Sequence, residues 1–197
     1  MLENIKKSLL ESSDLKKQVA QEYSEIIEQA INLICESLRN DKKVLLMGNG
    51  GSAADAQHIA GELIGRFKME RSSIPAIALT TDTSIITALG NDYGFDQIFA
   101  RQIESLGCEG DIVVAISTSG NSKNVIEALK ISRKNKMKSI GLLGCGGGLI
   151  KQLVDIPIVV PSYNTPRIQE AHIAIGHVIC EEIEKKLFKN KFNAKGH

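Results

Sequence analysis

Histidine and carboxylate side chains recur at spacings that would place them on one face of a helix. His58 and Glu62 are four residues apart, and Arg66 continues the same face. An imidazole and a carboxylate placed in this way can transfer protons or bind a metal ion, and the plain alternative is a solvated pair. The position favours chemistry, because a glycine-rich loop after an apolar run comes directly before this helix, and parallel sheets bind ligands at that point.

A second polar group lies in the apolar segment 167–188. Gln169 and His177 are eight residues apart, about 80° around a helix axis, so both side chains can reach one site. His172 lies nearly opposite His177 on the same helix. We expect His172 to pack in the core or at an interface.

Two loops that follow apolar runs could bind the polar part of a ligand. The pattern Gly48-x-Gly50-x-x-Ala53 formally matches a dinucleotide fingerprint, but that fingerprint needs an acidic residue about 20 positions on, and Asp82 lies about 34 beyond Gly48. Nicotinamide binding is therefore a weak alternative. The second loop, residues 117–122, contains four hydroxyl side chains and a glycine before a helix, whereas a helix cap needs only one hydroxyl. This loop predicts a phosphate cradle.

Five apolar runs, each followed by a helical stretch, must position these loops. Continuous apolar runs are typical of strands covered on both faces. The alternation predicts an α/β fold, with a doubly wound, flavodoxin-like, five-stranded parallel sheet flanked by helices. The predicted strands are 44–47, 74–79, 112–116, 139–143 and 156–160, and the predicted helices are 52–65, 83–89, 95–106, 122–135, 149–153 and 167–188.

A long helical segment comes before the sheet. No proline or glycine occurs between Glu3 and Leu38, and apolar residues recur at helical spacing. We expect a break near residues 12–14, where Ser13 or Asp14 could cap a second helix that ends at Arg39. A helix of about 25 residues is about 37 Å long, so its apolar stripe is expected to pack partly on another subunit. We predict a single domain, 1–197, made of a helical segment 1–40, a core 41–190 and a frayed tail 191–197.

Composition limits the classes of partner. The chain has 197 residues, 24 basic and 23 acidic, with a formal net charge of +1, which argues against nucleic acid as a partner. No apolar run reaches the length of about 18 residues that a membrane span needs, and the charged first residues do not form a signal sequence. The four cysteines lack the spacing of a metal site, so we expect structural thiols and a cytoplasmic location.

Four stretches of the sequence resemble the sugar isomerase (SIS) domain family, and within it the phosphoheptose isomerases. They are residues 48–67, 79–102, 115–125 and 167–184, preceded by the long leading helix. The resemblance implies an aldose–ketose isomerase that converts sedoheptulose 7-phosphate to D-glycero-D-manno-heptose 7-phosphate, the first step toward the heptose of bacterial surface polysaccharide. It also implies a homotetramer with sites near the subunit interfaces, no nucleic acid or membrane partner, and one zinc ion per subunit.

Each implied site position holds the expected type of residue. The resemblance makes Glu62 and His177 the acid–base pair, but it leaves open which is the acid and which the base, and whether both come from one subunit. The implied zinc ligands are His58, Glu62, Gln169 and His177. The implied substrate-binding residues are Asn49, Gly50, Gly51, Ser52, Glu62, Arg66, Asn91, Asp92, Ser117, Thr118, Ser119, Ser122 and Gln169.

Two alternatives remain within the same family. One relative is not an enzyme and binds the bacterial replication initiator, but the pair Glu62 and His177 favours catalysis here. Sugar-phosphate sensors and amino-sugar enzymes of the superfamily usually carry added domains, for which this chain has no room.

Overall fold

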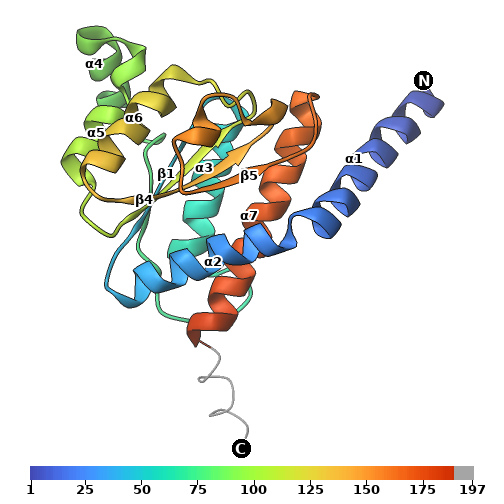
Figure 1. Ribbon diagram of the computed structural model, residues 1–197, viewed down its shortest axis with the longest axis horizontal. Coiled ribbons are helices and arrows are strands. Elements are labelled where there is room, and N and C mark those ends of the chain that lie inside the picture. The colour runs from blue at the N-terminus through green and yellow to red at the C-terminus, as the bar shows by residue number, and fades with distance from the viewer. Residues whose placement is uncertain (189–197) are drawn as a thin grey trace, which may run out of the picture.

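Five parallel strands form one sheet at the centre of the computed structural model, which describes residues 1–188 (Figure 1). The strand order is β2-β1-β3-β4-β5, as in doubly wound sheets of the flavodoxin type, so the predicted fold class is confirmed. The predicted tail 191–197 lies outside the described residues. The strands are β1 (Val44–Gly48), β2 (Ala76–Ala78), β3 (Ile112–Ser117), β4 (Lys138–Leu143) and β5 (Ile156–Val159).

Successive residues of each strand contribute to two separate cores, because their side chains alternate between the faces of the sheet. Leu46 packs with helices α2 (Ser24–Arg39), α3 (Gly51–Ile64) and α7 (Thr165–Phe188). Leu45 packs on the other face with helices α5 (Ala100–Leu106) and α6 (Lys123–Lys134). Both faces are therefore covered, which explains why the strands are apolar throughout.

The leading helix breaks later than the sequence suggests. Helix α1 (Leu2–Glu22) runs through residues 12–14 without interruption, and the chain bends at Tyr23. The predicted break and cap near Ser13 and Asp14 were wrong, since Asp14 instead pairs with Lys17 at 3.0 Å. At the actual break, the Ser24 hydroxyl donates to the carbonyl of Ala20, a group that a helix end leaves without its usual partner.

Three other predicted helices have different bounds or a different form. Helix α4 (Thr83–Tyr93) continues beyond residue 89, and segment 95–106 divides into a 3₁₀ turn, η1 (Phe95–Gln97), and α5. The predicted helix 149–153 is replaced by 3₁₀ turns η2 (Cys145–Gly147) and η3 (Ile150–Gln152). Glycines with positive φ at 146, 147 and 148 come directly before this segment, so no helix can extend back from residue 149.

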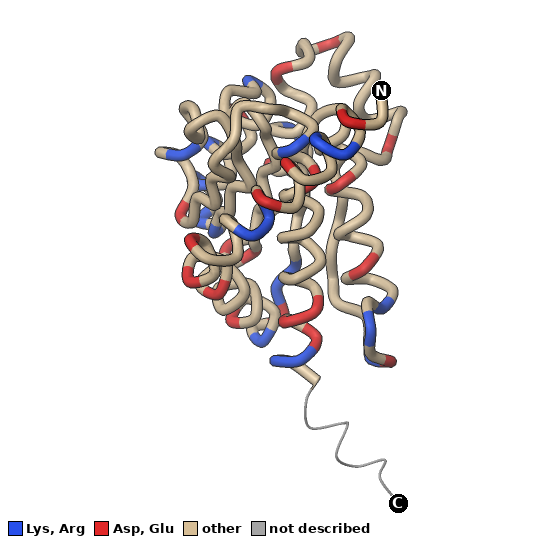
Figure 2. Tube along the Cα trace, turned by 90° about the vertical axis from the view of Figure 1, so that its right-hand side faces the viewer, with Lys and Arg blue, Asp and Glu red and all other residues tan. Residues whose placement is uncertain are grey.

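Charge and hydropathy are distributed as in a globular chain. Figure 2 shows acidic and basic residues interspersed, with both signs on the last turns of α7. Within residues 1–188, every helix is too short or too polar to cross a membrane. All four cysteines lie in this described part and are free thiols.

Candidate active site

Helices α3 and α7 pack closely enough to bring their polar side chains together. A Cβ atom added to Gly176 would lie 2.6 Å from Cδ1 of Ile59, so the absence of a side chain at this position permits the close approach. Next to this contact, Nε2 of His58 lies 2.8 Å from Nε2 of His177. Oε1 of Glu62 lies 3.4 Å from the same nitrogen of His58. Three of the predicted site residues therefore form one cluster.

The cluster combines nitrogen and oxygen donors that face one another. At 2.8 Å, one ring nitrogen donates a hydrogen bond and the other accepts it, so the two imidazoles share a single proton. The side chain of His58 is 48% exposed and that of Glu62 is 24% exposed, so a ligand can reach both. Their arrangement suits proton transfer.

The same donor set suits a zinc ion in the type of its ligand atoms. Two imidazoles and a carboxylate are common zinc donors. In the part of the chain that the structure describes, no group of three or more His, Cys, Asp or Glu side chains is already arranged around a metal position.

Gln169 lies two turns before His177 on α7 and reaches the first turn of α3. Its amide nitrogen occupies the space that a side chain at Gly51 would fill. Among the described contacts, no hydrogen bond joins Gln169 to the histidine cluster. The amide is therefore placed beside the glycine loop.

The glycine loop, residues 48–52, is tied to the start of α6 by a pair of amides. Nδ2 of Asn49 donates to Oδ1 of Asn124 at 2.9 Å, and Nδ2 of Asn124 donates to Oδ1 of Asn49 at 2.8 Å. Asn124 is only 2% exposed, and its oxygen also accepts from the amide of Val125. Gly50 has φ of +55°, a conformation that favours glycine. The sequence analysis missed Asn124, although its position two residues after Ser122 was a signal.

The hydroxyl loop, residues 117–122, begins beside the glycine loop, because β1 and β3 pair with Gly48 opposite Ile116. Oγ of Ser117 lies 2.9 Å from Oγ of Ser122 and accepts from the amide of Gly120 at 3.1 Å. The side-chain oxygen of Ser119 accepts from the amide of Asn121, and Thr118 is half-buried between these serines. Ser122 is the N-cap residue of α6 and makes no side-chain cap bond. Apart from the amide of Val125, which donates to Asn124, the amides at the start of α6 therefore remain available to an anion.

Three predicted substrate residues make no described hydrogen bond or ion pair with the cluster. Asn91 and Asp92 are exposed on α4, where the amide of Asn91 donates to Asp92 at 2.8 Å. Arg66 is 61% exposed and faces Glu70 at 3.6 Å. Among residues 1–188, none of the three shares a hydrogen bond or ion pair with His58, Glu62 or His177. Their role in binding the sugar therefore stays a prediction.

His172 packs in the core, as expected, and is fully buried. Its Nε2 lies 3.0 Å from the carbonyl oxygen of Leu143 at the end of β4. Burial lowers the pKa of His172 to about 4, and the Leu143 carbonyl opposes this shift. His172 is therefore a neutral structural residue at pH 7.

Comparison with known proteins shows which family this chain resembles. Residues 9–144 match the model of the SIS domain. A phosphoheptose isomerase of Geotalea daltonii is 55% identical over 95% of this chain and 98% of that protein, and one of Nitratiruptor is 56% identical over 94% and 99%.

Solved structures agree with these relatives. A phosphoheptose isomerase from Neisseria gonorrhoeae has a TM-score of 0.89 at 45% identity, covering 93% of this chain and 98% of that one. Another from Francisella tularensis has a TM-score of 0.91 at 42% identity, with the same coverage. Likeness to enzymes over nearly the whole chain decides against the non-catalytic replication-initiator binder. The chain belongs to the SIS domain family and, within it, to the phosphoheptose isomerases.

Proposed function

We propose that this isomerase converts sedoheptulose 7-phosphate to D-glycero-D-manno-heptose 7-phosphate in the cytoplasm, as the first step toward the heptose of bacterial surface polysaccharide. The observation that carries the proposal is the convergence of Glu62 on α3 with His177 on α7 through His58. Aldose–ketose exchange moves one proton between adjacent carbons and another between their oxygens. A carboxylate and an imidazole in one cluster can serve these two transfers.

Each residue of the proposed site has one role in the reaction or in binding. We assign Glu62 to the proton on carbon and His177 to the proton on oxygen. The hydroxyl loop and the amides at the start of α6 hold the phosphate, through Ser117, Thr118, Ser119 and Ser122. The residues that meet the sugar are Asn49, Gly50, Gly51, Ser52, Arg66, Asn91, Asp92 and Gln169.

One zinc ion per subunit completes the proposed site. His58, Glu62 and His177 supply donors of suitable type, and Gln169 adds an amide oxygen, a less common zinc ligand. When bound, the ion polarises the sugar carbonyl and stabilises negative charge on its oxygen.

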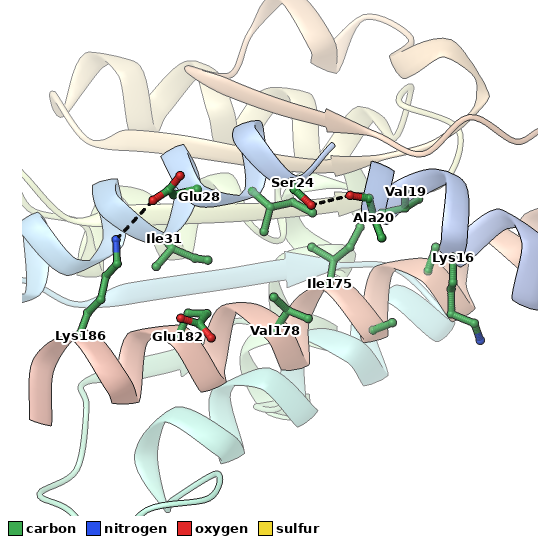
Figure 3. A pocket seen from close by; sticks show the side chains of 13 residues that line it. Lys16, Val19, Ala20, Ser24, Glu28, Ile31, Ile175, Val178, Glu182 and Lys186 are labelled. Carbon is green, nitrogen blue, oxygen red and sulfur yellow. Dashed lines mark hydrogen bonds and ion pairs between the residues drawn. The ribbon is translucent and has the colours of Figure 1, made fainter. Parts of the chain in front are cut away.

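We also propose a homotetramer, supported by apolar surface that one chain leaves open. A groove of about 450 Å³ runs between α1, α2 and α7, with Val19, Ile31 and Ile175 in its wall and Val178 48% exposed (Figure 3). Helix α1 extends beyond the body of the chain and exposes Leu2, Ile5, Leu9 and Leu10 (Figure 1). Exposed apolar surface of this extent is typical of subunit contacts.

The activity test follows aldose formation from sedoheptulose 7-phosphate, with and without a chelator. Glu62→Gln and His177→Ala should each lower kcat by about 10² to 10⁴, the usual contribution of a positioned proton carrier. Glu127→Gln, at a half-buried carboxylate on α6 paired with Lys130, is the control and should keep full activity. Near-normal activity in Glu62→Gln would refute the assignment, and a wild-type protein that forms no aldose would refute the substrate.

Sedimentation tests the assembly. Wild-type protein should sediment as a tetramer at micromolar concentration, and Val178→Glu should give smaller species because it places a charge in the groove. A wild-type monomer at this concentration would contradict the proposal.

A further inference from the structure

A buried ion pair joins the loop after α3 to the last turns of α7. Nε of Arg71 lies 2.8 Å from Oε1 of Glu184, and the two side chains are 0% and 1% exposed. The Glu184 carboxylate also accepts hydrogen bonds from the amides of Phe67, Lys68 and Met69 at 2.8 to 3.0 Å. Burial alone would raise the pKa of Glu184, but these amides and Arg71 lower it below its ordinary value. One ionised carboxylate therefore holds three consecutive residues of the loop.

The guanidinium of Arg71 closes the carboxyl end of α3. Its Nη2 donates to the carbonyl of Glu62 at 2.8 Å, and its Nη1 donates to the carbonyls of Leu63 and Gly65 at 2.9 and 3.3 Å. Carbonyls at a helix end lack partners within the helix, so Arg71 supplies them. The first of these carbonyls belongs to Glu62, whose side chain is proposed to transfer the proton on carbon.

The loop held by Glu184 also reaches the second proton carrier. The ring of Phe67, whose amide Glu184 accepts, lies 5.5 Å from the ring of His177, centre to centre, at an angle of 31°. The same imidazole contacts His58 at 2.8 Å. The Phe67 ring thus limits how far the His177 imidazole can rotate away from the cluster.

We propose that Arg71 and Glu184 are positioning residues for the isomerase reaction. Arg71 fixes the turn of α3 that carries Glu62, and Glu184 fixes Phe67 against His177. This inference rests on the proposed roles of Glu62 and His177 as proton carriers. Stability alone is a poor reason for a buried ion pair, since apolar residues of similar size often serve as well. Because Arg71 and Glu184 act on the segments that carry the two proton carriers, we infer that the pair serves catalysis.

The test compares Glu184→Gln with a matched control directly before β3, on segments other than α3 and α7. Glutamine keeps the volume of Glu184 but removes its charge and one acceptor oxygen. Asp111 is likewise buried and ion-paired, accepting from Nζ of Lys43 and from the amides of Lys43 and Cys108, so Asp111→Asn is an equivalent loss away from the site. Circular dichroism first establishes a temperature at which both variants are folded.

Kinetics should separate positioning from simple destabilisation. We expect Glu184→Gln to lower kcat about tenfold or more with KM changed less than about twofold, because a displacement near 1 Å costs about 10² in rate. Asp111→Asn should keep the wild-type kcat. Phe67→Leu leaves the ion pair intact and should lower kcat as well, and the double variant should be less impaired than the product of the two single effects. Equal kcat values for Glu184→Gln and Asp111→Asn would overturn the proposal.

Nuclear magnetic resonance of the imidazoles gives a readout that does not depend on activity. The chain has four histidines, so the signals of His177 can be assigned with a His177→Asn variant. In metal-free protein kept in a chelator, Glu184→Gln and Phe67→Leu should shift the His177 resonances, and Asp111→Asn should not. Unshifted resonances in Glu184→Gln would also overturn the proposal. If the wild-type protein did not isomerise the sugar, the proposed function would fail, and these resonances alone would decide the positioning role.

Discussion

Replacing Gly176 with alanine should separate the two helices that carry the proton carriers. The new Cβ atom would lie 2.6 Å from Cδ1 and 2.9 Å from Cγ1 of Ile59, a residue only 5% exposed. Carbon atoms normally pack about 3.5–4.0 Å apart, so Ile59 or α7 must move by about 1 Å. The movement occurs one residue before His177.

Two opposing effects set the change in the free energy of unfolding. Alanine is favoured over glycine in a helix interior by about 1 kcal/mol. Overpacking a core costs about 1–3 kcal/mol. We therefore expect Gly176→Ala to lower the free energy of unfolding by about 0–2 kcal/mol. The effect on kcat should be larger, about 10²-fold, because a displacement near 1 Å misaligns the reacting groups.

Gly61→Ala is the matched control. A Cβ atom at Gly61, on the exposed face of α3, would have no atom within 4 Å, so this variant should gain about 1 kcal/mol in stability and keep its activity. Urea unfolding and initial rates of isomerisation measure both effects. Adding Ile59→Val to Gly176→Ala removes the closer clash and should restore part of kcat. If Gly176→Ala behaved like Gly61→Ala in both assays, the close contact would not be what aligns His177 with His58.

Three further changes test other parts of the structure. Gly120→Ala should destabilise the fold and raise KM for the sugar phosphate in steady-state assays, because Gly120 has φ of +67° and a Cβ atom there would collide with the backbone of Gly147; an unchanged KM would argue against a phosphate cradle. Asn124→Ala should cost about 1 kcal/mol in urea unfolding by removing the amide pair with the half-buried Asn49, and it should raise KM too. Burial lowers the pKa of His172 from 6.5 to about 4. Between pH 6.5 and about pH 4, its imidazole therefore carries a proton in the unfolded chain but not in the folded chain. Stability should therefore fall as pH drops through this window, by about 2 kcal/mol at pH 5 relative to pH 7, and His172→Gln should remove this part of the pH dependence.

The sheet and the position of its ligand loops could be predicted because they depend on local pattern. The run 112–116 became β3 (Ile112–Ser117), since a strand buried on both faces must be apolar throughout. Helical spacing likewise placed His58 with Glu62. The break at Tyr23 could not be predicted in this way, because no proline or glycine marks it and Ser12 and Asp14 fit within a helix.

Contacts between segments that are distant in the sequence could not be predicted from its local pattern. Arg71 and Glu184 are 113 residues apart, and from the sequence alone each would be interpreted as an exposed charged residue. The crossing of α3 and α7 depends on Gly176 meeting Ile59, which neither helix reveals alone. The placement of Asn91 and Asp92 depends on how α4 sits on its neighbours, and periodicity does not contain that information.

Helix α4 has a consequence for how ligand binding would be detected. None of its residues is buried, and its first turn is held by the Asp82 carboxylate, which accepts from the amide of Ile85 at 3.0 Å. Helices with so little burial open locally at small cost, so their amide hydrogens exchange with solvent faster than those of the core. A molecule that engages Asn91 or Asp92 would slow this exchange along α4 and leave the protected amides of β1 and β3 unchanged. Deuterium uptake by this one helix would thus act as a built-in reporter of occupancy.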